Sequence, residues 1–271
     1  MIEVNNISFK YAGQKNLVFD DFSLKLEENN IYGLLGKNGT GKSTLLYLIS
    51  GLLRAKKGTV CFDGIETNKR RPETLREIFI VPEEFDLPSM SLKQYVKINE
   101  PFYPRFNNDV LEDCLKDFEL SMDIQLNALS MGQKKKVFMS FALAANTKLL
   151  LMDEPTNGLD IPSKSQFRKV VARFMTEERT LIISTHQVHD VVSLLDHILI
   201  LNQQKLLLDA PVAEITDKYT FEYRTPENME DALYAEPSLQ GNAIIAPRKE
   251  GSPETQINLE LLFNAVNEGK I

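Results

Sequence analysis

Short apolar runs alternate with segments of helical spacing along most of this chain. The runs are bounded by polar residues, glycine or proline, a pattern typical of buried strands. They cover residues 31–35, 77–81, 148–152, 180–184 and 197–201. Helical spacing follows the later runs, at 162–176 and 187–195. Apolar strands that alternate with helices predict a mostly parallel sheet in an α/β fold.

Three regions depart from this alternation. Residues 2–10, 17–26 and 58–64 read as strands joined by polar turns, which predicts an N-terminal antiparallel β subdomain. Between about 86 and 146 the spacing is helical, at 91–100, 109–118 and 132–145, with Ser91 and Asn108 as expected N-caps. After about residue 219 the pattern weakens. Residues 225–226, 236–237 and 249–254 look like loops, and 259–268 like a last helix. We therefore expect a main domain at 1–218, with the helical subdomain inserted at 86–146, and a small accessory region at 219–271.

Composition narrows the class of protein. The 271 residues are 43% hydrophobic and 25% charged, which is ordinary for a globular chain of one or two domains. The net charge of −7 argues against a general nucleic-acid binder. Cys61 and Cys114 stand far apart without metal-ligand neighbours, so a reduced, cytosolic protein is expected.

The N-terminal residues carry no basic start and no apolar run of the signal-peptide type. No stretch reaches the ~18 apolar residues of a membrane span. If the protein works at a membrane, we expect another chain to supply the span.

One glycine-rich segment carries most of the chemistry. It fits the pattern G-x-x-x-x-G-K-[ST], between a predicted strand and a predicted helix. Its residues are Gly36, Lys37, Asn38, Gly39, Thr40, Gly41, Lys42, Ser43 and Thr44. Backbone N–H groups at a positive helix end form a cradle for polyphosphate. Lys42 would then reach the β- and γ-phosphates, and the Ser43 hydroxyl would hold Mg²⁺.

A second segment ends a buried strand in two carboxylates. Residues 149–152 are apolar, and Asp153 and Glu154 follow directly. Beside a phosphate cradle, Asp153 would bind Mg²⁺ and Glu154 would orient and deprotonate the attacking water. Without the phosphate loop, the same pair would read as a strand that enters a polar loop.

Four further residues are weaker signals when taken alone. Ser130 and Gly132 precede a helical run and would present a second anion-binding helix end, although a serine N-cap is common there. His186 follows a strand at the edge where α/β sheets bind ligands, although a lone histidine there is more often structural. Tyr11 could stack on an adenine ring or be an edge aromatic.

Together and in this order, these segments resemble the ATP-binding subunit of ABC transporters, over about residues 2–218. The resemblance implies an α/β fold: a P-loop NTPase (RecA-like) core with a mostly parallel sheet, an N-terminal antiparallel β subdomain and an inserted α-helical subdomain. It assigns Tyr11 to adenine stacking, Glu83 to the magnesium-linked position and His186 to the switch histidine. Residues 129–133 match the signature peptide, so Ser130, Gly132 and Gln133 are expected to bind nucleotide. Residues 157–160 match the aspartate loop, which adds Asp160.

Three positions depart from the family pattern. Glu83 replaces the usual glutamine, and a carboxylate is a charged, harder ligand for Mg²⁺. Met131 replaces the first of two glycines in the signature peptide. Lys136 stands where arginine is common and lacks its planar pair of donors.

The resemblance implies a Mg-dependent ATPase that works as a head-to-tail dimer, with a second copy or a paralogue, on integral membrane permease subunits. We expect a cytoplasmic protein, peripheral on the inner face of the cell membrane, and no nucleic-acid partner. Residues 258–263 resemble a C-terminal motif of drug or peptide exporters, which favours export. Candidate docking aromatics for the membrane partner are Phe85, Phe102, Tyr103 and Phe106, which could equally form the core of the helical insert.

Two other functions fit parts of the sequence. One is a soluble ABC-type ATPase in DNA repair or translation, although such relatives usually carry coiled-coil inserts, zinc cysteines or tandem cassettes. The other is a nucleotide-dependent switch that binds ATP and hardly hydrolyses it, against which Glu154 argues.

Overall fold

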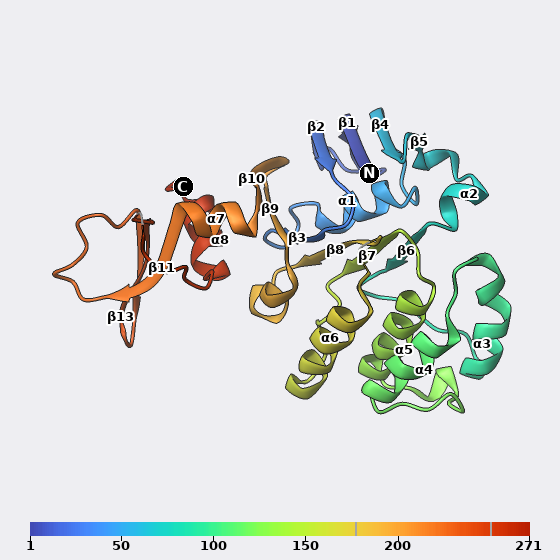
Figure 1. Cartoon of the computed structure of the whole chain (residues 1–271). Coiled ribbons are helices and arrows are strands. Elements are labelled where there is room, and N and C mark those ends of the chain that lie inside the picture. Colours follow the sequence, from blue (N-terminus) through green and yellow to red (C-terminus); the bar gives the residue numbers. More distant parts are fainter. Residues whose placement is uncertain (177, 250) are drawn as a thin grey trace.

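The computed structural model describes residues 1–176, 178–249 and 251–271. Its elements form three sheets and several groups of helices (Figure 1). The four-stranded sheet has the order β2-β1-β4-β5, the six-stranded sheet β10-β9-β3-β8-β7-β6, and the three-stranded sheet β11-β13-β12. The predicted α/β fold with a separate antiparallel subdomain is confirmed.

The six-stranded sheet is the centre of the molecule. Its strands are β3 (Ile31–Leu35), β6 (Ile78–Val81), β7 (Leu149–Asp153), β8 (Thr180–Thr185), β9 (His197–Asn202) and β10 (Lys205–Pro211). All neighbours pair in parallel except β10, which runs antiparallel to β9 at one edge. Strand β7 is fully buried, as expected for a parallel strand covered on both faces. Because these strands are parallel, the carboxyl ends of β3, β7 and β8 lie side by side at the same end of the sheet.

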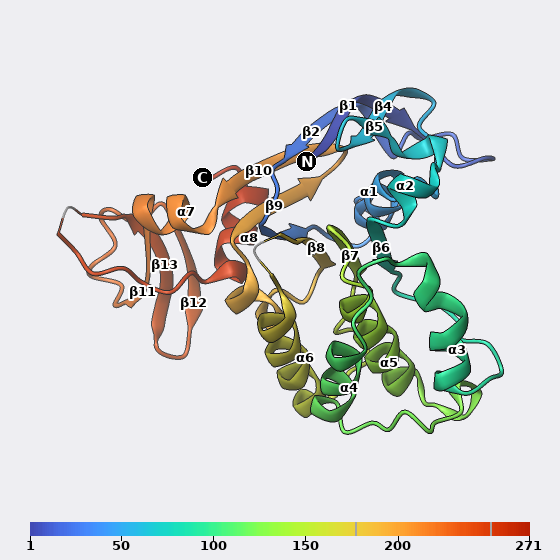
Figure 2. The same cartoon turned by 45° about the vertical axis from the view of Figure 1, so that its right-hand side comes forward.

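Two hydrophobic cores lie on opposite faces of this sheet (Figure 2). On one face, helix α1 (Lys42–Ile49) packs under the antiparallel sheet of β1 (Ile2–Phe9), β2 (Phe19–Leu26), β4 (Lys57–Phe62) and β5 (Ile65–Glu66). On the other face lie α4 (Asn108–Asp117), α5 (Met131–Ala144) and α6 (Ile161–Phe174). Alternate residues of a strand point to opposite faces, so β7 supplies Leu149 and Leu151 to the first core and Leu150 and Met152 to the second.

The helical insert consists of α3 (Leu92–Asn99), α4 and α5. Ser91 caps α3 in a capping box, as predicted. The N-cap of α4 is Asn107 rather than the predicted Asn108, because the Asn107 side chain accepts the first N–H groups of that helix. Phe141 of α5 lies at the centre of an aromatic cluster with Tyr95, Tyr103 and Phe106. None of the helices in the described residues is long and apolar enough to cross a membrane.

Short elements complete the connections between these units. They are α2 (Pro72–Leu75) and the 3-10 helices η1 (Thr67–Lys69), η2 (Glu100–Phe102), η3 (Leu126–Ala128), η4 (Val188–Asp190) and η5 (Val192–Leu194). The helix predicted at 187–195 is therefore wrong in type, since two separate 3-10 turns occupy that segment.

Helix α7 (Val212–Lys218) leads from β10 into the C-terminal region, which forms a sheet of its own. Its strands are β11 (Tyr219–Arg224), β12 (Tyr234–Ser238) and β13 (Gly241–Pro247). The loop predicted at 236–237 was wrong, because β12 is an edge strand and tolerates Pro237. Helix α8 (Leu259–Asn267) confirms the last predicted helix and packs against this sheet and against η4.

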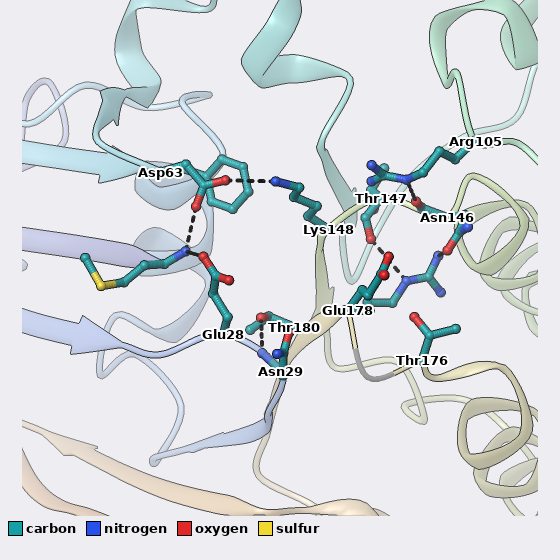
Figure 3. A pocket seen from close by; sticks show the side chains of 13 residues that line it. Glu28, Asn29, Asp63, Arg105, Asn146, Thr147, Lys148, Thr176, Glu178 and Thr180 are labelled. Atoms are coloured by element: carbon teal, nitrogen blue, oxygen red, sulfur yellow. Dashed lines mark hydrogen bonds and ion pairs between the residues drawn. The ribbon is translucent and has the colours of Figure 1, made fainter.

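A polar pocket of about 590 Å³ opens at the amino ends of β7 and β8 (Figure 3). Lys148 and Asp63 point toward one another across it, with 3.4 Å between Nζ and Oδ2. Beneath it, the buried guanidinium of Arg179 donates to the carbonyls of Leu143 and Thr147. A cation at these carbonyls stabilises the carboxyl end of α5. None of the phosphate-loop residues lines this pocket, so it is distinct from the candidate site below.

Candidate functional site

The phosphate loop joins β3, in the middle of the central sheet, to α1. Gly39 and Gly41 have φ angles of 81° and 104°, a left-handed conformation that favours glycine. A Cβ at Gly41 would lie 2.9 Å from atoms of Val18 and Phe19. No side chain caps the first turn of α1. Its N–H groups therefore stay available to an anion at the positive end of the helix.

Lys42 folds back over this loop. Its ammonium donates to the carbonyls of Gly36 at 2.8 Å and Lys37 at 3.3 Å, and lies 3.7 Å from Glu154 Oε1. Only 6% of the residue is exposed. Burial lowers the pKa of Lys42, while the charges of Glu154 and Asp153 oppose that shift. The lysine is thus a buried cation that spans the phosphate loop and the acidic pair.

Asp153 ends β7 beside β8. Its carboxylate accepts a hydrogen bond from the Ser184 hydroxyl on β8. Burial raises the pKa of Asp153, although the nearby hydroxyls of Ser184 and Ser43 lower it. Asp153 is 1% exposed and adjoins a second buried acid, Glu154. A cation beside the Asp153 carboxylate would offset the free-energy cost of burying this negative charge.

Glu154 follows with a φ of 45°, the left-handed conformation that non-glycine residues rarely adopt. This turn directs its carboxylate toward the end of β8. Oε1 lies 2.8 Å from His186 Nδ1, while Oε2 accepts from the Thr185 hydroxyl at 3.1 Å and the His186 backbone at 3.3 Å. Strained backbone held by surrounding bonds is common at functional sites. Glu154 and His186 therefore form one hydrogen-bonded unit.

Two other predicted residues lie at the rim of the same pocket. Glu83 Oε1 accepts a hydrogen bond of 2.7 Å from the amide of Asn157. The Tyr11 hydroxyl is 3.0 Å from that of Thr44, and its ring packs edge-on against Phe9. Each residue thus reaches the pocket from an element outside the phosphate loop.

The pocket itself has a volume of about 540 Å³. It is lined by Tyr11, Gln14, Val18, Asn38, Gly39, Gly41, Lys42, Ser43, Thr44, Glu83, Glu154, Asn157 and His186. Gly36, Lys37 and Thr40 of the predicted cradle line neighbouring pockets instead. Gln14 and Val18 were not expected in the pocket, since neither belongs to a motif that could be read from one sequence. Thr185 directly precedes the predicted switch histidine, but no role was predicted for its hydroxyl.

Five further predicted residues do not line the pocket: Asp153, which is buried at the end of β7, and Ser130, Gly132, Gln133 and Asp160. Ser130 and Gln133 form a capping box at the start of α5, with 3.3 Å from the Gln133 amide to Ser130 Oγ. Asp160 caps α6 by accepting from the Ser163 amide at 2.9 Å. The uncapped N-terminus of α1 therefore lies in the pocket, whereas the N-termini of α5 and α6 are capped by side chains that do not line it.

The donor set suits a hard divalent cation. Ser43 and Glu83 line the pocket and could provide a hydroxyl and a carboxylate, and Asp153 at the end of β7 could provide a second carboxylate. Mg²⁺ binds through one or two carboxylates and substrate phosphates, and keeps several waters. Among the described residues, no group of three or more acids, histidines or cysteines could hold a metal ion. The residues fit Mg²⁺ that arrives with a nucleotide.

The fold and the site together define a P-loop ATPase of the cassette type: a RecA-like core, an antiparallel β subdomain and a helical insert. The family model described as "ABC transporter" matches residues 19–157. The chain belongs to this family.

Its relatives agree with that assignment. ABC transporter ATP-binding protein YtrB of Bacillus subtilis is 31% identical over 81% of this chain and 75% of its own length. Lantibiotic transport ATP-binding protein SrtF of Streptococcus pyogenes is 28% identical over 85% of this chain and 95% of its own. Bacitracin transport ATP-binding protein BcrA of Bacillus licheniformis is 27% identical, over 78% and 70%.

A solved structure, the "Dimeric Structure of MJ0796, a Bacterial ABC Transporter Cassette", shares the fold with a TM-score of 0.68. It is 24% identical over 78% of this chain and 99% of that one. The chain is an ATP-hydrolysing subunit of an ABC transporter, which works with membrane permease subunits.

Proposed function

We propose that two ATPase subunits, either two copies of this chain or this chain and a paralogue, enclose each ATP between them and thereby drive export through a membrane permease. Lys42 and Glu154 of one subunit would form one wall, and the start of α5 of the other subunit would form the opposite wall. The observation that carries the proposal is the position of Ser130 outside its own nucleotide pocket.

The two helix ends complement one another. ATP carries about four negative charges, and the pocket meets them from one side only, through α1 and Lys42. The N-terminus of α5 is a second positive helix end, and the neighbouring Met131 is 48% exposed. A second subunit would add this end from the open side. Each nucleotide would then hold the dimer closed, and hydrolysis would release it.

Within each site the side chains divide the work. Glu154 would accept a proton from the attacking water, and His186 would hold that carboxylate in place through its 2.8 Å contact. Lys42 would exchange the Gly36 carbonyl for the β- and γ-phosphates. Ser43, Asp153 and Glu83 would hold Mg²⁺, which neutralises phosphate charge. Tyr11 would stack on the adenine.

The permease would dock on a groove of about 660 Å³ between α2, β6 and the helical insert. Three candidate aromatics are packed: Phe85 on Phe138, and Tyr103 and Phe106 on Phe141. Phe102 lines the groove and is 67% exposed. We assign Phe102 as the docking aromatic, since a large exposed apolar side chain beside a groove is typical of an interaction site. We propose that the subunit binds its permease as a peripheral protein on the inner face of the membrane.

The names of SrtF and BcrA, which refer to lantibiotic and bacitracin transport, support transport of a peptide or drug. They also favour transport over DNA repair or translation. The motif at residues 258–263 favours export as its direction. Residues 219–271 would form an accessory domain that follows the ATPase domain of 1–218.

Replacement of Glu154 by glutamine tests the proposal. The amide keeps the shape of the side chain and cannot accept the proton, so MgATP should bind and stay. Light scattering should then report a rise in mass from 30.8 kDa to about twice that value, reversed on removal of the nucleotide. A protein that binds MgATP and stays monomeric at every concentration would contradict the homodimeric form. The heterodimeric form is tested in the same assay by addition of a paralogous ATPase subunit, if one copurifies with this chain.

A further inference from the structure

Lys135 is a buried cation that the catalytic scheme has not used. It lies in the second turn of α5 and is 4% exposed. Within the described residues it has no carboxylate partner at ion-pair distance. Its ammonium instead donates to two backbone carbonyls, those of Glu154 at 3.2 Å and Asn157 at 2.8 Å. A buried ammonium is costly, so its position calls for a reason.

The two carbonyls belong to the turn that aims Glu154. Glu154 has a left-handed backbone, and the Asn157 amide closes the turn onto the Glu154 carbonyl at 3.1 Å. Lys135 bonds both ends of this turn from the outside. Side chains that fix the backbone of a reacting residue hold it close to its productive geometry.

Asn157 connects the same lysine to Glu83. Its carbonyl accepts from Lys135, and its side-chain amide donates to Glu83 Oε1 at 2.7 Å. Burial lowers the pKa of Lys135, and the negative charges of Glu83, Glu154 and Asp153 only partly oppose that shift. Lys135 therefore brings a positive charge close to Glu83. Glu83 itself adds a negative charge to the site, because it replaces the neutral glutamine that is usual at this position.

The neighbouring lysines of α5 do not share this position. Lys134 pairs with Asp86 at 3.5 Å, and Lys136 donates to Gln166 at 3.1 Å and lies over the Phe118 ring. Neither contacts the turn of residues 154–157. The three consecutive lysines thus provide one candidate and two matched controls.

We propose that Lys135 is a positioning residue for Glu154, holding the 154–157 turn through its carbonyls and balancing the charge of Glu83 across Asn157. The proposal rests on the function proposed above, since it assumes that Glu154 is the general base.

The test compares Lys135→Met, Lys135→Gln and the control Lys136→Met in the full chain. Lys135→Met should lower kcat by about 10- to 100-fold, as for other residues that orient a reacting group. The KM for ATP should stay within about twofold, because the phosphate loop is untouched. Lys135→Gln keeps a donor without the charge and should retain intermediate activity. Lys136→Met should behave like the wild type.

Hydrogen exchange of the amides at 154–158 gives a readout that needs no turnover. These amides should exchange faster in nucleotide-free Lys135→Met than in the wild type or in Lys136→Met. Unchanged exchange and a kcat within about twofold of the wild type would overturn the proposal.

A double-mutant cycle with Glu83→Gln tests the balance of charge. If Lys135 compensates Glu83, the double variant should lose less activity than the two single losses combined. Additive losses would overturn this part of the proposal. Glu154→Gln is measured alongside: if it turns over normally, the proposed function fails, whereas a dead Glu154→Gln with an active Lys135→Met removes only the inference.

Discussion

His186 Nδ1 lies 2.8 Å from Oε1 of Glu154, and the His186 backbone amide donates to Oε2 of the same carboxylate. One residue therefore holds both oxygens of the acid that follows β7, from the end of the neighbouring strand β8. The parallel pairing of β7 with β8 makes this contact possible, because it aligns Asp153 with Ser184. The sheet itself thus orients the candidate base.

Replacement of His186 by alanine should lower turnover while ATP still binds. Glu154 would keep the Thr185 hydroxyl but lose the ring that fixes Oε1, and a small misplacement of a reacting group can cost about 10²-fold in rate. Phosphate release measures the loss, and fluorescent-nucleotide titration checks the affinity. His189→Ala, on the exposed side of the same loop, is the control. Wild-type turnover in His186→Ala would remove this contact from the mechanism.

Replacement of Lys42 by alanine should remove on the order of 3 kcal/mol of transition-state stabilisation, by analogy with loss of one preorganised donor. It also leaves the buried Glu154 carboxylate without its cation at 3.7 Å. Steady-state ATPase kinetics measure the change in kcat/KM, with Lys25→Ala, an exposed lysine of β2 outside the site, as the control. Unchanged kinetics in Lys42→Ala would contradict the assignment.

Replacement of Asp153 by asparagine should stabilise the nucleotide-free protein while it weakens Mg²⁺-dependent activity. Burial raises the pKa of Asp153 in the folded state, so the ionised acid costs stability at neutral pH. Asparagine can still accept the Ser184 hydrogen bond, and removal of such a cost at a functional site yields about 1 kcal/mol.

The pH dependence of that gain follows from the direction of the shift. A raised pKa means that the folded state binds the proton more tightly than the unfolded state. The gain from asparagine should be full above the folded pKa and shrink as the pH falls through it toward the ordinary value of 3.8. Melting temperatures of both proteins in a chelator, measured across this range, check it. A difference that grows as the pH falls would contradict the assignment.

Much of the fold follows from local pattern. The apolar runs that became β3, β6, β7, β8 and β9 are buried on both faces, so their side chains alone signal a parallel sheet. The C-terminal sheet was not predicted, because β12 contains Pro237 and β13 gains its burial from α8 and its neighbouring strands. Burial that comes from such tertiary contacts produces no periodic pattern of hydrophobic residues in the sequence.

The site divides in the same way. The phosphate loop and the acidic pair can be read from consecutive residues, since each motif is local. The contacts of Glu154 with His186 and of Asn157 with Glu83 join residues far apart in the chain, and only the fold brings them together. Lys135 could not be separated from Lys134 and Lys136 in the sequence. The helical phase of α5 decides which of the three faces the turn.

In the proposed dimer, Ser130 of one subunit faces the phosphate loop of the other. Cysteine cross-linking measures this contact in a protein that carries Glu154→Gln and lacks both native cysteines through Cys61→Ser and Cys114→Ala. One tagged chain carries Asn38→Cys, and a second chain with a different tag carries Ser130→Cys. In the control, the second chain carries Ser121→Cys, beyond α4, in place of Ser130→Cys.

We expect a cross-link between the two tags with MgATP, little without nucleotide, and none from Ser121→Cys. Ser130→Arg should block ATP-driven association while each monomer still binds ATP. A dimer that forms with MgATP and never joins Asn38→Cys to Ser130→Cys of the other chain would contradict an ATP site shared between two subunits.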